Sequence, residues 1–147
     1  MEKHLESKVA VLTGAGGGIG QAAAVKLAQN KMKVVLLGGH NKDKLDLTRR
    51  AVEEYTDCLV IPGDLTDLDF LEAGVAETVT RMGGIDVLIN NAGFLDNGLK
   101  AIDSFTDDDM NKVIDINTKG TMYCTRAVLK YMIPANSGSI INLDSVA

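Results

Sequence analysis

The chain has 147 residues, of which 46% are hydrophobic and 24% are charged, and its formal net charge is −5. This size and composition are typical of a globular protein with one hydrophobic core, and we expect residues 1–147 to form a single domain. The acidic balance argues against nucleic acid or an anionic membrane as a partner, because such partners require clustered lysine and arginine. Small molecules are the expected ligands.

The N-terminal segment and the two cysteines bear on the cellular compartment. Residues 1–8 are polar and lead directly into a predicted strand, so we expect no signal peptide. No stretch approaches the ~20 apolar residues that span a bilayer. Cys58 and Cys124 lie in apolar segments, which predicts buried free thiols rather than a disulfide or metal ligands. We therefore expect a cytoplasmic protein without a metal site.

Apolar segments of strand length alternate with segments of helical periodicity. In chain order, we expect strand 8–13, helix 19–30, strand 33–37, helix 42–55, strand 58–61, helix 67–82, strand 85–89, a helical stretch from 107 to about 132, and strand 139–143. Thr66 and Thr106 are expected to cap the helices that follow them. We expect a break in the last helical stretch near Asn117, and a turn at residues 134–138.

This alternation of strands and helices indicates the fold class. Parallel strands need a return connection of helix length, and strands that are apolar throughout are typical of a sheet covered on both faces. The sequence therefore predicts a doubly wound α/β fold with a parallel sheet of five strands. No repeat, low-complexity tract or linker suggests a domain boundary.

A glycine-rich turn follows the first predicted strand and opens the first predicted helix, because residues 13–20 read Thr-Gly-Ala-Gly-Gly-Gly-Ile-Gly. Backbone N–H groups at a helix N-terminus bind phosphate, and glycine lets the phosphate approach that backbone. Taken alone, such a run is about as often a turn that needs positive φ. Its place between strand and helix favours a dinucleotide pyrophosphate site. Gln21 stands where a mononucleotide P-loop would need its lysine, which excludes that motif.

Further motifs follow the glycine turn in a fixed order. They are Asp64-Leu65 after the third strand, Asn90-Asn91-Ala92-Gly93 after the fourth, Asn117 in the next helix, and Ser145 after the fifth strand. Together with Thr13-Gly14-x-x-x-Gly18-x-Gly20, this set resembles the short-chain dehydrogenase/reductase family. The resemblance covers residues 8–147 and implies the first five strands of a Rossmann-type domain, without the C-terminal part of the usual fold.

The resemblance also implies which residues bind a nicotinamide dinucleotide. The positions that would contact it are Thr13, Gly14, Gly16, Gly17, Gly18, Ile19, Gly20, Gly39, His40, Asp64, Leu65, Asn91, Ala92 and Gly93. Asp64 would accept a hydrogen bond from the adenine amino group, and the backbone of Leu65 would contact the ring. The alternatives are that Asp64 is a plain turn residue and that residues 90–93 form only a turn.

Two catalytic roles are implied by the same resemblance. Asn117 would hold a water of a proton relay through its backbone carbonyl, with a solvated helix asparagine as the alternative. Ser145 would be the catalytic serine, whose hydroxyl donates to the substrate carbonyl oxygen. The implied reaction is hydride transfer between the nicotinamide and a secondary alcohol or ketone.

Cofactor choice is expected at the end of the second strand, where an acidic residue would bond the ribose hydroxyls and exclude a 2′-phosphate. Gly38 and Gly39 stand there instead, and His40, Lys42 and Lys44 follow with positive charge. Many NADP-preferring relatives carry arginine where this chain has Gly17. We expect NAD(P) as the cofactor with a slight preference for NADP, while a solvated loop is an alternative at least as strong for the basic residues.

The family reaction also needs a tyrosine followed four positions later by a lysine. None of the three tyrosines, Tyr55, Tyr123 and Tyr131, has a lysine at that spacing. We expect part of a longer reductase that would form a dimer or tetramer at full length. The alternative is a short, non-catalytic dinucleotide-binding module.

Overall fold

A computed structural model describes residues 4–95 and 100–144. At its centre lies a five-stranded sheet in the order β3-β2-β1-β4-β5, in which all neighbouring strands are parallel. In chain order the strands are β1 (Val9–Thr13), β2 (Lys33–Leu37), β3 (Cys58–Ile61), β4 (Val87–Asn90) and β5 (Ser139–Asn142). The doubly wound α/β fold predicted from the sequence is confirmed.

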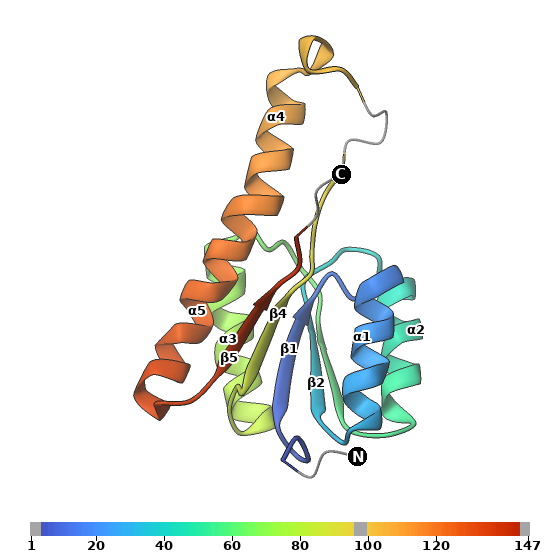
Figure 1. The fold of residues 1–147 in the computed structure, drawn as a ribbon, viewed down its shortest axis with the longest axis vertical. Coiled ribbons are helices and arrows are strands. Elements are labelled where there is room, and N and C mark those ends of the chain that lie inside the picture. The colour runs from blue at the N-terminus through green and yellow to red at the C-terminus, as the bar shows by residue number, and fades with distance from the viewer. Residues whose placement is uncertain (1–3, 96–99, 145–147) are drawn as a thin grey trace.

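Helices cover both faces of this sheet (Figure 1). On one face lie α1 (Gly18–Gln29) and α2 (Lys42–Glu53), and on the other lie α3 (Leu68–Met82) and α5 (Thr121–Ala135). Alternate side chains of a strand point to opposite faces, so each central strand serves two cores. Val11 of β1 packs in the core beside α3 and α5, and Leu12 packs in the core beside α1 and α2. This double burial explains why the strands are apolar throughout.

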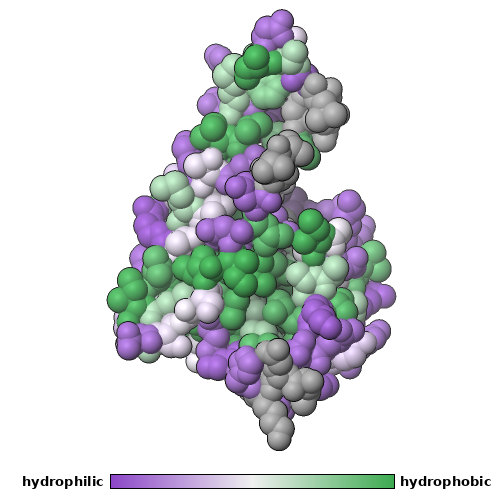
Figure 2. Space-filling view, viewed as in Figure 1, coloured by the Kyte–Doolittle hydropathy of each residue, from purple (hydrophilic) through white to green (hydrophobic). Residues whose placement is uncertain are grey.

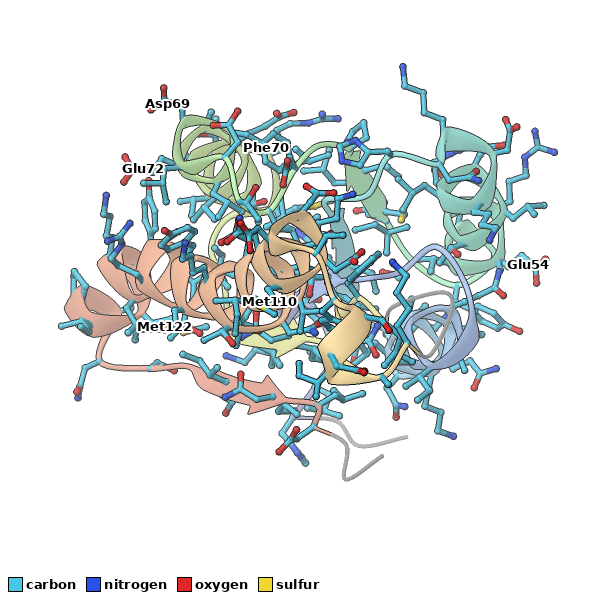
Figure 3. The ribbon with its side chains drawn as sticks, turned by 90° about the horizontal axis from the view of Figure 1, so that it is seen from above. Glu54, Asp69, Phe70, Glu72, Met110 and Met122 are labelled. Atoms are coloured by element: carbon cyan, nitrogen blue, oxygen red, sulfur yellow. The ribbon has the colours of Figure 1, made fainter. Side chains whose placement is uncertain are left out.

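A long helical rod rises past the carboxyl ends of the strands (Figure 1). It consists of α4 (Asp107–Ile114), the π-helical segment η2 (Asp115–Gly120) and α5, and the short 3₁₀ helix η1 (Ile102–Ser104) precedes it. Seen from above, α3 with Phe70 and Glu72 lies alongside the rod, which carries Met110 and Met122 (Figure 3). An ion pair of 2.6 Å between Lys130 Nζ and Glu72 Oε1 joins α5 to α3.

Two local predictions are wrong. Asp67, not Thr66, caps α3, because the Thr66 hydroxyl donates to Asp64 Oδ1 while Asp67 Oδ1 accepts from the N–H groups of residues 69 and 70. Pro134 does not begin a turn but lies inside α5. Pro134 has no N–H to donate to the carbonyl of Lys130, but α5 continues past this one missing bond and ends where Asn136 adopts the left-handed conformation.

The order of the strands places two loops side by side. Strands are added outward from β1 to β2 and β3 on one side, and from β4 to β5 on the other. The loops after β1 and β4 therefore leave the carboxyl edge at adjacent positions and turn in opposite directions. In open α/β sheets, ligands bind in the crevice at this topological switch point.

Candidate dinucleotide site

Gly14 and Gly20 make the turn after β1 compact. A β-carbon on Gly20 would lie 2.2 Å from the carbonyl oxygen of Gly14, and one on Gly14 would lie 2.7 Å from Cα of Ala92. Gly14 also has a φ of +70°, in the left-handed region. These two glycines are required for close packing of the turn, α1 and the segment after β4.

Gly17 and Gly18 serve a different purpose, because they border open space. A β-carbon at either position would have no neighbour within 4 Å, and their φ angles are +153° and +55°. Gly17 is the N-cap of α1, and no side chain of the described residues caps this helix end by a hydrogen bond. The first N–H groups of α1 therefore retain their capacity for an anion, which the helix dipole also favours. The turn fits the pyrophosphate of a dinucleotide, and the exposed Ile19 lies beside it.

Thr13 and Asn91 bind the glycine turn to the segment after β4. The Thr13 hydroxyl oxygen accepts from the backbone N–H of Asn91 at 3.1 Å and from that of Ala92 at 3.0 Å. In return, the Asn91 side chain donates to the carbonyls of Thr13 and Gly14 at 3.1 and 3.0 Å. These four contacts hold the two loops at the switch point in one rigid arrangement.

Asn90 extends this arrangement to β5. Its side-chain nitrogen donates to Asn142 Oδ1 at 2.9 Å and to Thr125 Oγ1 at 3.1 Å. Asn90 is only 4% exposed, and its Oδ1 has no hydrogen-bond partner among the described residues. The two consecutive asparagines thus bind to opposite sides of β4. Asn90 is hydrogen bonded to β5 and α5, and Asn91 to the end of β1.

Asn117 lies within η2, where the sequence analysis expected a break. Its side chain makes a two-way contact with the loop after β4, accepting from Phe94 N at 2.7 Å and donating to Phe94 O at 2.9 Å. Its backbone carbonyl accepts from the Thr121 hydroxyl at 3.1 Å. A π-helical turn is often found at functional sites because it displaces backbone groups from the regular ladder. Asn117 is exposed, and its side chain also holds the backbone of Phe94.

The ends of β2 and β3 form the opposite part of the site. Gly39 and Gly63 exchange two backbone hydrogen bonds of 2.8 and 3.1 Å. Asp64 Oδ1 accepts from the backbone N–H and the hydroxyl of Thr66, and these contacts lower the pKa of Asp64, with a further contribution from the charge of His40. Asp64 thus holds the turn after β3 through Oδ1, and its carboxylate stays charged at the edge of the site.

The structure brings most of the predicted site residues together. The turn residues contact Asn91 and Ala92, Gly93 lies against Asn117, and the buried Leu65 lies against Gly38. Ser145 lies outside the described residues, although Asn142, three residues before it, is hydrogen bonded to Asn90.

Within residues 4–95 and 100–144, no helix is long and apolar enough to cross a membrane. In the same residues, no three His, Cys, Asp or Glu side chains form a group that could hold a metal ion. Both cysteines are free, with Cys124 buried and Cys58 half-buried. Burial raises the pKa of each thiol to about 12.

A glycine turn opening the first helix of a doubly wound sheet defines a dinucleotide-binding domain. The sequence profile of the short chain dehydrogenase family matches residues 8–147. The chain belongs to the short-chain dehydrogenase/reductase family, whose members are oxidoreductases.

Individual relatives agree with this assignment. An uncharacterized oxidoreductase from Staphylococcus aureus (strain MRSA252) is 36% identical over 143 residues, which are 97% of this chain and 60% of the relative. An NAD+-bound xylitol dehydrogenase superimposes with a TM-score of 0.93 at 32% identity, over 99% of this chain and 55% of that one. A short chain dehydrogenase from Mycobacterium paratuberculosis bound to NAD has a TM-score of 0.89 at 31% identity, over 96% and 56% of the two chains. The chain therefore spans little more than half the length of the proteins it matches.

Sequence reasoning missed one residue that shapes the site. Thr48 is fully buried, and its hydroxyl lies 2.7 Å from the carbonyl oxygen of Ala15 in the glycine turn. Its position was visible in the helical spacing of Leu45, Thr48 and Val52, all of which are buried on one side of α2. This contact fixes α2 against the turn.

Proposed function

We propose that this chain is the cofactor-binding part of an NAD(P)-dependent short-chain dehydrogenase/reductase that interconverts a secondary alcohol and a ketone. The observation that carries the proposal is the open turn at Gly17 and Gly18, which leaves the N-terminus of α1 uncapped. The turn is held by the contacts of Thr13 and Asn91. A rigid, preformed anion site is what a pyrophosphate requires.

The residues of this chain would bind and orient a dinucleotide as follows. The N–H groups at the start of α1 would hold the pyrophosphate, and Asp64 with the backbone of Leu65 would hold the adenine. The segment 91–93 would lie against the nicotinamide ribose. When bound, the nicotinamide would supply or accept the hydride. The substrate would be a small molecule with a carbonyl or alcohol group.

Asn117 and Ser145 would take part in the chemistry of the full-length protein. Ser145 would donate a hydrogen bond to the substrate oxygen, and the carbonyl of Asn117, in the π-helical segment η2, would hold a water for proton transfer. No tyrosine of residues 1–147 is followed by lysine four positions later, so the tyrosine and lysine of the proposed reaction would not come from this stretch. A non-catalytic dinucleotide-binding module remains the second candidate, favoured by that absence.

A titration of the 147-residue chain with NAD+ and NADP+ by isothermal calorimetry tests the binding proposal. The variant Gly18→Asn places a side chain where the pyrophosphate would lie, and asparagine tolerates the left-handed φ at this position. We expect its affinity for both dinucleotides to fall about tenfold or more, since charge-assisted hydrogen bonds to phosphate are lost.

The matched control is Gly83→Asn, at another left-handed glycine that borders open space at the far end of α3. This variant should bind as the unmodified chain does. Equal affinity of the Gly18→Asn variant and the unmodified chain would show that the turn does not hold the pyrophosphate.

Hydride transfer needs a chain of the relatives' length. In such a protein, Ser145→Ala should lower the rate of ketone reduction by orders of magnitude while the affinity for dinucleotide stays nearly constant. An intact mass near 15.6 kDa for the natural protein, with dinucleotide binding and no activity, would favour the module instead.

A further inference from the structure

The conformation of the glycines leaves few positions at which this chain could distinguish NADP from NAD. An acid at the end of β2 would exclude a 2′-phosphate. Gly38 has a φ of +86°, and a β-carbon there would lie 2.6 Å from Leu65 Cδ2. Gly17, with a φ of +153°, disfavours a side chain in the turn. The backbone therefore disfavours an acidic residue at position 38, after β2, and a basic residue at position 17, in the glycine turn.

Three basic residues, His40, Lys42 and Lys44, follow β2, and their surroundings differ. The charge of His40 acts on the Asp64 carboxylate. Lys42 lines a hollow of about 310 Å³ on the β3 side of α2, together with Val60 and Pro62. Residues two apart in a helix point to nearly opposite sides, so Lys44 faces away from that hollow.

Lys44 lies over the glycine turn itself. A β-carbon on Gly16 would be 3.7 Å from Lys44 Cβ, which places the start of the lysine side chain directly beside the turn. The Thr48 hydroxyl, within hydrogen-bond distance of the carbonyls of Ala15 and Lys44, keeps α2 in this position, and Asn41 caps the helix by accepting from Lys44 N.

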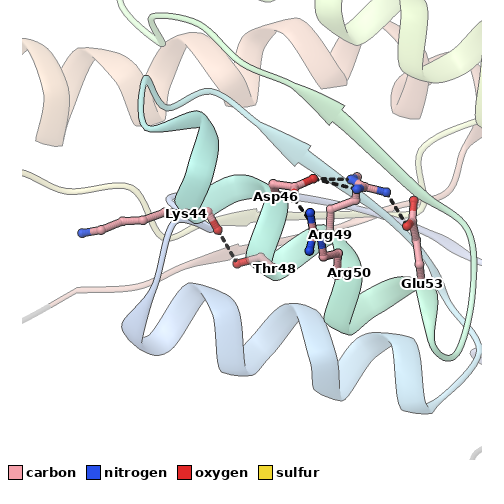
Figure 4. A network of polar contacts seen from close by, with 6 residues as sticks. All are labelled: Lys44, Asp46, Thr48, Arg49, Arg50 and Glu53. Atoms are coloured by element: carbon pink, nitrogen blue, oxygen red, sulfur yellow. Dashed lines mark hydrogen bonds and ion pairs between the residues drawn. The ribbon is translucent and has the colours of Figure 1, made fainter.

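The ammonium group of Lys44 is also available. Figure 4 shows its side chain extending away from the ion pairs that Arg49 and Arg50 make with Asp46 and Glu53. Among the described residues no carboxylate forms an ion pair with Lys44. A lysine beside the turn, with no ion pair among the described residues, suits a phosphate on the adjacent ribose.

We propose that Lys44 recognises the 2′-phosphate of NADP, so that cofactor choice depends on an attraction from α2 rather than on a repelling acid after β2. This inference rests on the proposed function, because it requires a dinucleotide in the glycine turn. Lys44 would act as a specificity-determining residue without a part in hydride transfer.

Calorimetric titration of the 147-residue chain with NADP+ and NAD+ tests the inference through two variants. Lys44→Met removes the charge and keeps much of the side-chain length, and we expect about a tenfold loss of NADP+ affinity with NAD+ affinity changed less than about twofold. Lys42→Met removes the same charge from the other side of α2 and should leave the affinity ratio unchanged. The affinity for adenosine 2′,5′-bisphosphate should fall in the Lys44→Met variant, and the affinity for 5′-AMP should stay unchanged.

Different failures have different meanings. If both dinucleotides bind and Lys44→Met leaves their ratio unchanged, or Lys42→Met lowers NADP+ affinity equally, the role of Lys44 is overturned while the proposed function stands. If neither dinucleotide binds the unmodified chain, the proposed function is overturned and the role of Lys44 with it.

Discussion

At the scale of single residues, the Thr13 hydroxyl joins the glycine turn to the segment after β4. It is 1% exposed and accepts from two backbone N–H groups of the segment after β4. Asn91 and Ala92 are half-buried, and the one buried oxygen of Thr13 satisfies both of their N–H groups. Thr13 is thus a structural member of the site that holds the turn in its binding shape.

Replacing the hydroxyl by a methyl group tests this role. Thr13→Val should lower the free energy of unfolding by about 1–3 kcal/mol, because two donors lose their partner. Thr13→Ser keeps the oxygen and should retain most of the hydrogen-bond contribution. Urea unfolding followed by circular dichroism compares the variants. Equal stability of the valine and serine variants would contradict the argument.

At the scale of elements, the start of α4 shows how completely a helix end can be encoded locally. The Thr106 hydroxyl accepts from Asp109 N at 3.2 Å, and Asp109 Oδ2 accepts from Thr106 N at 2.9 Å, forming a capping box. Lys100 Nζ lies 2.9 Å from the same carboxylate oxygen. The Thr106 backbone N–H, followed by Lys100 and the Thr106 hydroxyl, lowers the pKa of Asp109 from 3.8 to about 2. The sequence prediction that Thr106 caps this helix is confirmed.

This depressed pKa predicts how α4 responds to acid. A group whose pKa is lowered in the folded state stabilises the fold above its unfolded pKa, and the stabilisation is lost as pH falls through the folded value. The start of α4 should therefore fray between about pH 4 and pH 2. Carboxyl chemical shifts from NMR titration should place the Asp109 midpoint near the lower limit, and Lys100→Met should raise it. A midpoint near 4 in the unmodified chain would refute the prediction.

At the scale of the whole molecule, one side of the sheet is covered less well than the other. In the described sheet β5 is an edge strand, and a groove of about 720 Å³ runs between it and α5. Apolar side chains of Met122, Leu129 and Ile133 line the groove, and Figure 2 shows apolar surface gathered over this face. Ile141 of β5 is 49% exposed. An open, apolar strand edge promotes association between chains.

The 147-residue chain should therefore self-associate in a concentration-dependent way. Ile141→Lys places a charge on the strand edge and should shift the chain toward monomer in sedimentation velocity. Leu47→Lys is the control, because Leu47 is exposed on α2, away from β5. A similar shift in both variants would mean that net charge, rather than the β5 edge, governs association.

The sequence by itself determined the features that depend on near neighbours. Apolar runs indicated strands, helical spacing indicated helices, and Thr106 with Asp109 indicated a cap, because these patterns act within a few residues. The order of motifs from Thr13 to Asn117 indicated the family, which the match to residues 8–147 confirms.

The tertiary structure alone decided which residues work together across the chain. It separates the glycines that permit close packing, such as Gly20, from those that face open space, such as Gly18. It shows that Asn117 holds Phe94 and that Thr48 holds Ala15, pairs 23 and 33 residues apart. Such contacts depend on the strand order, which brings distant segments to one edge of the sheet, and no local spacing encodes that order.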